Sequence, residues 1–138
     1  MKPPAGYSGT PLLKKLGVKP GANCCAINAP ADYFELLGAL PAGANFSGQL
    51  AAGLDFIHFF SANRSELTSK LPALLKRIVP DGMIWISWPK KSSGVPSTIT
   101  EDVIRAVALP LGLVDVKVCA VDEIRSGLKL MIRRENRR

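Results

Sequence analysis

Few side chains in this sequence have the type and spacing that catalysis or metal binding requires. The single histidine, His58, lies within the apolar run Phe56–Phe60, so a serine or cysteine nucleophile has no accessible base beside it. The three cysteines also fall in apolar stretches, and no C-x-x-C pair or other metal-ligand spacing occurs. The sequence therefore predicts no catalytic residue and no metal site. The cysteines are Cys24, Cys25 and Cys119.

Polar side chains follow the predicted strands, at the points where those strands end, and Asp122 and Glu123 follow the strand that ends at Val121. The carboxyl ends of parallel strands share one edge of a sheet, where ligands bind in open α/β folds. Predicted helix N-termini at Asp32 and Asn63 would favour an anion there. We predict a small anionic or nucleotide-like ligand at this edge; the alternative is that the loop Ser87–Thr98 only covers the edge. The candidate ligand-binding residues are Asn28, Asp32, Asn63, Arg64, Trp88, Lys90 and Lys91.

Hydrophobic spacing and turn residues predict the elements that would position these side chains. Strands are predicted over residues 22–28, 44–47, 55–60, 83–88, 114–121 and 128–133. Helices are predicted over residues 11–16, 32–37, 63–79 and 98–110, with Pro72 either kinking the third helix or separating its first turns. The predicted N-caps are Thr10, Asp32, Asn63 and Thr98, and Pro80-Asp81-Gly82 is a predicted turn.

The order of these elements indicates the fold class. Strands alternate with helices until a short link joins the last two strands, which must then be antiparallel. Right-handed crossovers place the helices on both faces of the sheet. We therefore predict an α/β fold of three-layer, Rossmann-like type, with a mostly parallel sheet that ends in an antiparallel hairpin.

Length and composition are typical of one globular domain: 138 residues, of which 47% are hydrophobic and 21% charged. We expect a single domain over residues 1–138, with an N-terminal arm (1–9) and a basic tail (134–138). No apolar run approaches the ~20 residues that span a bilayer, and no signal peptide is recognisable. Because the cysteines suit a reducing compartment, we expect a cytoplasmic protein without membrane contact.

The formal net charge of +7 is concentrated in part at the end of the sequence, where four arginines and one glutamate occur within Arg133–Arg138. A solvated tail explains this pattern, so nucleic acid is not expected as a partner. Contact of the tail with nucleic acid is kept as an alternative. The sequence leaves the oligomeric state open.

From Asp55 onward the sequence resembles the carboxy-terminal half of a class I S-adenosylmethionine methyltransferase. The resemblance implies a truncated methyltransferase-like topology, with S-adenosylmethionine as the cofactor to consider. It rests on Asp55-Phe56-Ile57, Pro80-Asp81-Gly82-Met83, Leu111-Gly112-Leu113 and the closing hairpin.

The sequence departs from that class where the cofactor would bind. Such methyltransferases hold the cofactor over a glycine-rich loop after the first strand, where glycine lets the backbone approach the ligand. Here the loop is Asn28-Ala29-Pro30-Ala31-Asp32, which contains no glycine. In that class an acidic residue after the second strand also binds the ribose of the cofactor, but this sequence has no acidic residue between Glu35 and Asp55. We therefore expect no bound cofactor.

Three further segments resemble a bacterial domain-of-unknown-function family, and the similarity runs through the whole sequence. The resemblance supports the fold and implies no activity. The segments are Gly6-Tyr7-Ser8-Gly9-Thr10-Pro11-Leu12, Ser87-Trp88-Pro89-Lys90-Lys91-Ser92-Ser93-Gly94-Val95-Pro96 and Val116-Lys117-Val118-Cys119-Ala120-Val121-Asp122-Glu123.

These observations favour a non-catalytic binding or interaction module with a methyltransferase-like fold that lacks the cofactor loop. The alternative is a divergent S-adenosylmethionine-dependent methyltransferase. A second alternative is a protein that contacts nucleic acid through its basic tail. Whether the protein is an enzyme stays open, with the balance against catalysis.

Overall fold

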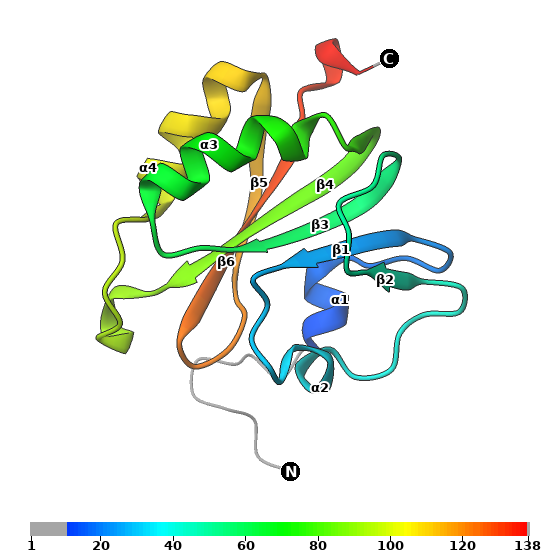
Figure 1. Cartoon of the computed structure of the whole chain (residues 1–138), viewed down its shortest axis with the longest axis horizontal. Coiled ribbons are helices and arrows are strands. Elements are labelled where there is room, and N and C mark those ends of the chain that lie inside the picture. Colours follow the sequence, from blue (N-terminus) through cyan, green and yellow to red (C-terminus); the bar gives the residue numbers. More distant parts are fainter. Residues whose placement is uncertain (1–10, 138) are drawn as a thin grey trace.

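A computed structural model describes residues 11–137 and contains one six-stranded sheet (Figure 1). The strand order is β2-β1-β3-β4-β6-β5, in which β2, β1, β3 and β4 are parallel and β6 runs antiparallel to both of its neighbours. The strands are β1 (Asn23–Ile27), β2 (Asn45–Ser47), β3 (Leu54–Phe60), β4 (Ile78–Pro89), β5 (Leu113–Ala120) and β6 (Arg125–Ile132). The helices are α1 (Leu12–Leu16), α2 (Tyr33–Leu37), α3 (Arg64–Leu75) and α4 (Glu101–Ala108).

The central strands are buried on both faces because helices cover each side of the sheet. Ile84 and Ile86 pack with α3 and α4, whereas Trp85, between them in β4, packs with α1 and α2. Figure 1 shows α3 and α4 lying together along one side of the sheet. The Trp85 indole Nε1 donates a 2.9 Å hydrogen bond to the carbonyl of Leu16, which fixes α1 against the sheet. The predicted three-layer, mostly parallel fold with a terminal hairpin is confirmed.

The predicted turn at Pro80-Asp81-Gly82 is wrong, because these residues belong to β4. Leu54 of β3 pairs with Ile78 and Phe56 pairs with Met83, so four residues of β4 bulge opposite Asp55. Pairing with β3 on both sides of the bulge keeps the segment in the sheet although its composition favours a turn. The final strand likewise begins at Arg125 rather than at residue 128.

The helices differ from prediction mainly at their ends. α3 continues through Pro72 and ends at Leu75 rather than at residue 79, because the chain joins β4 from Ile78. The N-cap of α4 is Thr100 and not Thr98; its hydroxyl accepts a hydrogen bond from the Val103 amide. None of the helices within residues 11–137 is long and apolar enough to cross a membrane.

The basic tail is attached more firmly than its composition predicts. Arg134–Asn136 forms a 3-10 turn, and Arg137 Nε donates a 2.8 Å hydrogen bond to the carbonyl of Ile132. The Asn136 amide also donates to the carbonyl of Gly112. Bonds from side chains to backbone carbonyls thus hold a segment that has no apolar residue. The predicted N-terminal arm and the predicted cap Thr10 lie outside the described residues.

Gly127 of β6 occupies a position with no room for a side chain. A Cβ atom there would lie 3.0 Å from Val121 Cγ2 and 3.2 Å from Trp85 Cε3. We expect Gly127→Ala to lower the free energy of unfolding by about 1–3 kcal/mol through overpacking, measured by urea denaturation. Gly48→Ala is the control, because a Cβ at Gly48 meets no atom within 4 Å. Equal stability of the two variants would contradict this account of the core.

Candidate functional site

The loop that follows β1 is joined to the end of β3 by the side chain of Asn28. Asn28 adopts a left-handed conformation with φ of 59°. Its amide Nδ2 donates to the carbonyl of Phe60 at 3.2 Å and to Glu66 Oε2 at 3.4 Å. The Asn28 side chain therefore bridges the carboxyl ends of β1 and β3. It does so from the loop after β1, which is the loop that holds the cofactor in the methyltransferase class that the sequence resembles.

The start of α3 is fixed by a second group of polar side chains at the same edge. Asn63 Oδ1 accepts a 3.1 Å hydrogen bond from the Glu66 amide, which confirms Asn63 as the N-cap. The Ser61 hydroxyl donates to Glu66 Oε1 at 2.5 Å. Asn63 Oδ1 and both carboxylate oxygens of Glu66 thus already have protein partners.

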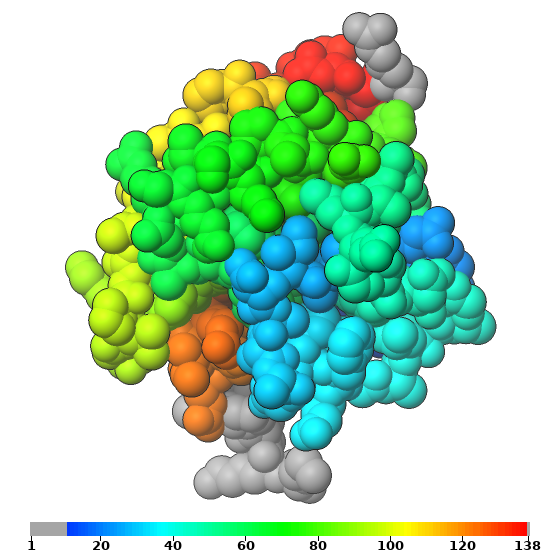
Figure 2. Space-filling view, in the orientation of Figure 1, coloured from blue at the N-terminus to red at the C-terminus, as the bar shows by residue number. Residues whose placement is uncertain are grey.

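A hollow of about 410 Å³ opens at this edge, between α2 and the link that joins β5 to β6. In Figure 2 the link, in orange, lies beside the light-blue segment that leads into α2, at the lower side of the molecule. The volume is within the range of small-molecule sites. Its lining combines apolar side chains with three carboxylates and one guanidinium. The lining residues are Pro30, Asp32, Leu36, Asp122, Glu123, Ile124 and Arg125.

Asp122 gives the link its shape. One carboxylate oxygen accepts hydrogen bonds from the amides of Ile124 and Arg125, and the other forms a 2.8 Å ion pair with Arg125 Nη1. The Arg125 guanidinium lies 5.8 Å from the centre of the Phe60 ring, a favourable cation–π distance. Arg125 is therefore fixed by both a carboxylate and a ring, and its charge offsets that of Asp122.

Asp32 has a different environment at the opposite wall of the hollow. It occupies the N-cap position of α2, but its side chain accepts no capping hydrogen bond, contrary to the prediction that it caps this helix. The residue is exposed. Its φ of −93° and ψ of 15° depart from the extended conformation that a capping residue usually adopts. The Asp32 carboxylate therefore lies at the hollow and does not cap α2.

Beneath α2, a chain of hydrogen bonds runs through the only histidine. The Tyr33 hydroxyl is bonded to His58 Nδ1 at 2.9 Å, and His58 Nε2 to the Ser87 hydroxyl at 2.6 Å. All three residues are buried, and the Phe60 ring stacks on the imidazole with centroids 4.2 Å apart. Burial lowers the pKa of His58 to about 3. The Ser87–His58 pair is therefore a neutral structural contact that no substrate reaches, as the sequence predicted for this histidine.

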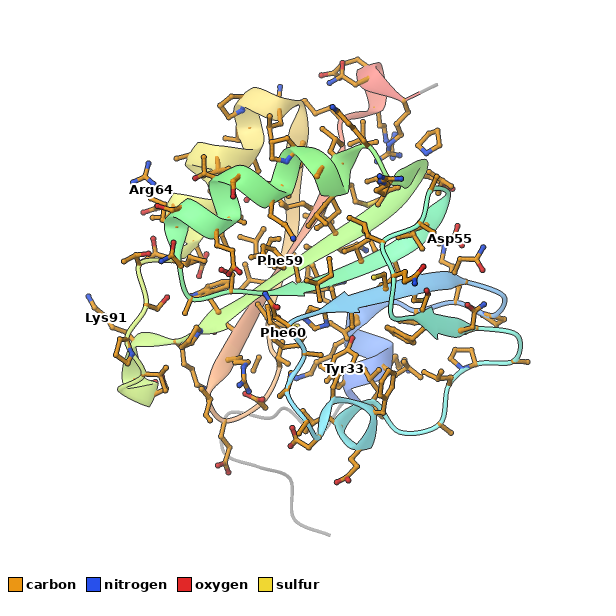
Figure 3. All side chains as sticks on the ribbon, viewed as in Figure 1. Tyr33, Asp55, Phe59, Phe60, Arg64 and Lys91 are labelled. Atoms are coloured by element: carbon orange, nitrogen blue, oxygen red, sulfur yellow. The ribbon has the colours of Figure 1, made fainter. Side chains whose placement is uncertain are left out.

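The remaining predicted site residues do not converge on the hollow. Arg64 and Lys91 extend outward at separate points on one side of the molecule (Figure 3). Trp88 is 6% exposed and packs in the core beneath α3 and α4. The Lys90 amide donates a 2.8 Å hydrogen bond to the carbonyl of Ile124, so its backbone adjoins the link. The structure thus brings Asp32 and the backbone of Lys90 near the hollow and places the other side chains elsewhere.

Sequence reasoning placed Asp122 and Glu123 at this edge but missed Arg125, Leu36 and Ile124. The spacing of Asp122 and Arg125, three residues apart in a predicted link, was the available signal for a folded turn. Nothing in the sequence indicated that this link would approach α2, because that contact depends on how the hairpin lies across the sheet.

The three cysteines are free thiols, and burial raises the pKa of each. Cys24 and Cys25 are buried and form no disulfide, and burial raises the pKa of Cys24 to about 11. A thiol with a raised pKa is a poor nucleophile at neutral pH. Within residues 11–137, no three side chains of His, Cys, Asp or Glu are grouped so that they could hold a metal ion.

A smaller hollow of about 220 Å³ lies at the opposite edge of the sheet, beside the loop Gly17–Ala22 and Asp55. Figure 3 places Asp55 far across the molecule from Lys91. Asp55 Oδ2 accepts a 2.8 Å hydrogen bond from the Asn23 amide, so this carboxylate already has a backbone partner. We place the candidate site at the carboxyl edge, where open parallel sheets bind ligands.

Comparisons with known proteins identify chains of similar fold. No protein-family model matches the chain, and no curated protein matches it in sequence. A possible exported protein from Bordetella parapertussis is similar in structure, with a TM-score of 0.65 and 11% identity; the match covers 88% of this chain and 65% of that chain. A SAM dependent methyltransferase from Aquifex aeolicus has a TM-score of 0.61 and 15% identity, over 88% of this chain and 87% of the other.

A third similar structure is magnesium protoporphyrin IX methyltransferase from Synechocystis PCC 6803 with bound SAM. Its TM-score is 0.56 at 13% identity, with 88% of this chain and 74% of that chain covered. At such identities the similarity establishes the fold alone. The chain has the Rossmann-like fold of the class I methyltransferases, as its sequence predicted.

The burial of His58 predicts a specific dependence of stability on pH. Below about pH 6.5 a histidine in the unfolded chain takes up a proton, whereas folded His58, with its pKa of about 3, does not. The folded state therefore loses roughly 1.4 kcal/mol of stability for each pH unit below 6.5. Urea denaturation between pH 7 and 5 measures this loss, which reflects the only histidine in the chain.

His58→Gln is the matched variant, since it removes the titrating ring; its stability should change far less over that range. In the unaltered protein, the NMR signal of the His58 ring should show no protonation between pH 7 and 5. A ring signal that titrates near pH 6.5 would overturn the assignment of a neutral, buried imidazole.

Proposed function

We propose that this protein binds a small organic ligand in the hollow between α2 and the β5–β6 link, and that it does so without covalent chemistry. The observation that carries this proposal is the lining of the hollow: three carboxylates, one guanidinium and the apolar side chains of Leu36, Ile124 and Pro30. A ligand with an apolar body and a cationic or hydrogen-bond-donating group matches such a lining.

The charges in the hollow favour a cationic group over an anion. Arg125 is paired with Asp122 at 2.8 Å, so its charge is offset within the link. Asp32 faces this pair from α2 and has no capping bond to its own helix. A cation near Asp32 would gain from the carboxylate, whereas a phosphate would be repelled. This differs from the anionic ligand that the sequence favoured at the same edge.

Two features support binding without catalysis. The side chains that line the hollow include no serine, cysteine, lysine or histidine. The Ser87–His58 pair, which has the spacing of a nucleophile and its base, is completely buried beneath α2. A nucleophile must reach its substrate as well as its base, so this pair does not serve that role.

A divergent S-adenosylmethionine-dependent methyltransferase is the second candidate, and the similar structures favour it. In that class S-adenosylmethionine supplies a methyl group to a nucleophile. The residues of this chain do not fit the usual binding mode, because Asn28 bridges Phe60 and Glu66 where the glycine loop would receive the cofactor. After β2, Ser47–Gln49 provides no acid for the ribose. A methyltransferase built on this chain would have to hold its cofactor differently.

Two further proposals, on the family and on the cellular location, are based on the sequence. We propose that the chain belongs to the bacterial domain-of-unknown-function family that its motifs resemble. We also propose a cytoplasmic location, which suits cysteines that form no disulfide among the described residues.

The ligand proposal is tested by NMR titration with phenethylamine, which joins an apolar ring to an ammonium group. We expect millimolar binding with shifts confined to α2 and the β5–β6 link, and little effect of the uncharged analogue 2-phenylethanol. Asp32→Asn should weaken binding several-fold, because it removes one charge partner of the amine. Glu35→Gln, which removes a charge from the same helix outside the hollow, should leave binding unchanged.

Diffuse shifts, or equal shifts in Asp32→Asn and the unaltered protein, would contradict the proposed site. S-adenosylmethionine is titrated in parallel, and we expect no binding at sub-millimolar concentration. Binding of S-adenosylmethionine at sub-millimolar concentration would favour the methyltransferase candidate.

A further inference from the structure

Two lysines face each other across the terminal hairpin. Lys117 of β5 and Lys129 of β6 are direct partners in the register of the antiparallel pair. Like charges directly opposite one another on a sheet are destabilising. Lys117 is exposed and Lys129 half-buried, so the second charge is only partly screened by water. The hairpin therefore carries an unfavourable charge pair that an anion would relieve.

Two more lysines approach this pair from α1 and from the loop that follows it. Lys117 Nζ donates to the carbonyl of Lys15 at 3.4 Å, and Lys15 Nζ donates to the carbonyl of Ala120 at 3.3 Å. Burial lowers the pKa of Lys129, and the charges of Lys117 and Lys19 lower it further. Lys15, Lys19, Lys117 and Lys129 thus form one group on the α1 side of the sheet, called the lysine patch below.

Carboxylates do not neutralise the hairpin lysines. The salt bridges found among residues 11–137 all involve Arg105 or Arg125, and none includes Lys19, Lys117 or Lys129. Asp115, the acid on β5 itself, is paired with Arg105 of α4 at 2.9 Å, on the opposite side of the sheet. Among residues 11–137, the charges of Lys19, Lys117 and Lys129 therefore have no salt-bridge partner.

We propose that the lysine patch binds the phosphodiester backbone of a nucleic acid. Protein interfaces are depleted in lysine and rich in aromatic side chains and arginine, whereas lysine is a common phosphate contact. Among the described residues, the most exposed aromatic side chain is Phe34, which packs against Phe46 of β2 at the other end of the sheet. Contact through phosphates without base stacking makes this binding independent of nucleotide sequence.

This surface is separate from the hollow and does not depend on a ligand there. It also differs from the tail contact that the sequence left as an alternative. The four lysines come from α1, from its following loop and from two strands about a hundred residues further along the chain. Only folding brings them together, which explains why the sequence did not indicate a nucleic-acid surface.

Fluorescence anisotropy with a labelled 20-nucleotide single-stranded RNA tests the proposal on the full chain. Affinity should fall with salt, with a slope of log K against log salt of about −3 for four contacts at roughly −0.7 each. The double variant Lys117→Ala, Lys129→Ala should reduce that slope by about 1.4 and weaken binding about tenfold at low salt. Its melting temperature should not fall, because the variant removes a like-charge pair.

Lys70→Ala, Lys76→Ala is the control, since it removes the same charge from α3 and its C-cap on the other side of the sheet. This control should keep the affinity and the salt slope of the unaltered protein. Equal losses in both double variants would show a response to net charge alone and overturn the proposal. Absence of RNA binding at 25 mM salt would overturn it too, as would tighter binding to poly-glutamate than to the RNA at equal charge, which would assign the patch to an acidic protein.

Discussion

The hydrogen-bonded chain from Tyr33 through His58 to Ser87 is the interaction on which the carboxyl edge of this protein depends. α2 has five residues, too few for a stable helix without tertiary contacts. Tyr33, at its first position, is anchored through the buried imidazole to β3 and β4. Asp32 precedes Tyr33, and Leu36 lies one turn after Asp32. The hydrogen bond from Tyr33 to His58 therefore fixes the position of the two α2-side residues that line the hollow.

At the same edge, side chains of this chain decide where space for a ligand is available. Asn28, in a left-handed conformation, links the loop after β1 to the end of β3 through a hydrogen bond from its side-chain amide. The available volume lies instead towards the β5–β6 link, whose shape comes from Asp122. This hollow, which we propose as the ligand site, lies at the edge where open parallel sheets bind ligands.

Much of the architecture was predictable because it depends on local patterns. The continuous apolar run around Trp85 predicted a strand, and the short link between the last two predicted strands indicated an antiparallel pair, as found for β5 and β6. The predicted turn at Pro80-Asp81-Gly82 was wrong because pairing with β3 on both sides keeps these residues in β4, although their composition favours a turn. Thr98 and Thr100 are both suitable N-cap residues by type. In the structure Thr100 Oγ1 accepts the capping bond from the Val103 amide, whereas Thr98 Oγ1 accepts a bond from the Arg64 amide of α3.

The site was less predictable, since it depends on contacts between distant segments. Parallel topology correctly brought Asp32 and Asp122 to one edge, but it could not show that Arg64 and Lys91 point away from it (Figure 3). The most direct test of the central claim is a crystal structure of the protein soaked in S-adenosylmethionine. The account predicts an intact bond from Asn28 to the Phe60 carbonyl and no cofactor density over Ala29–Ala31; density there, with Asn28 displaced, would contradict it.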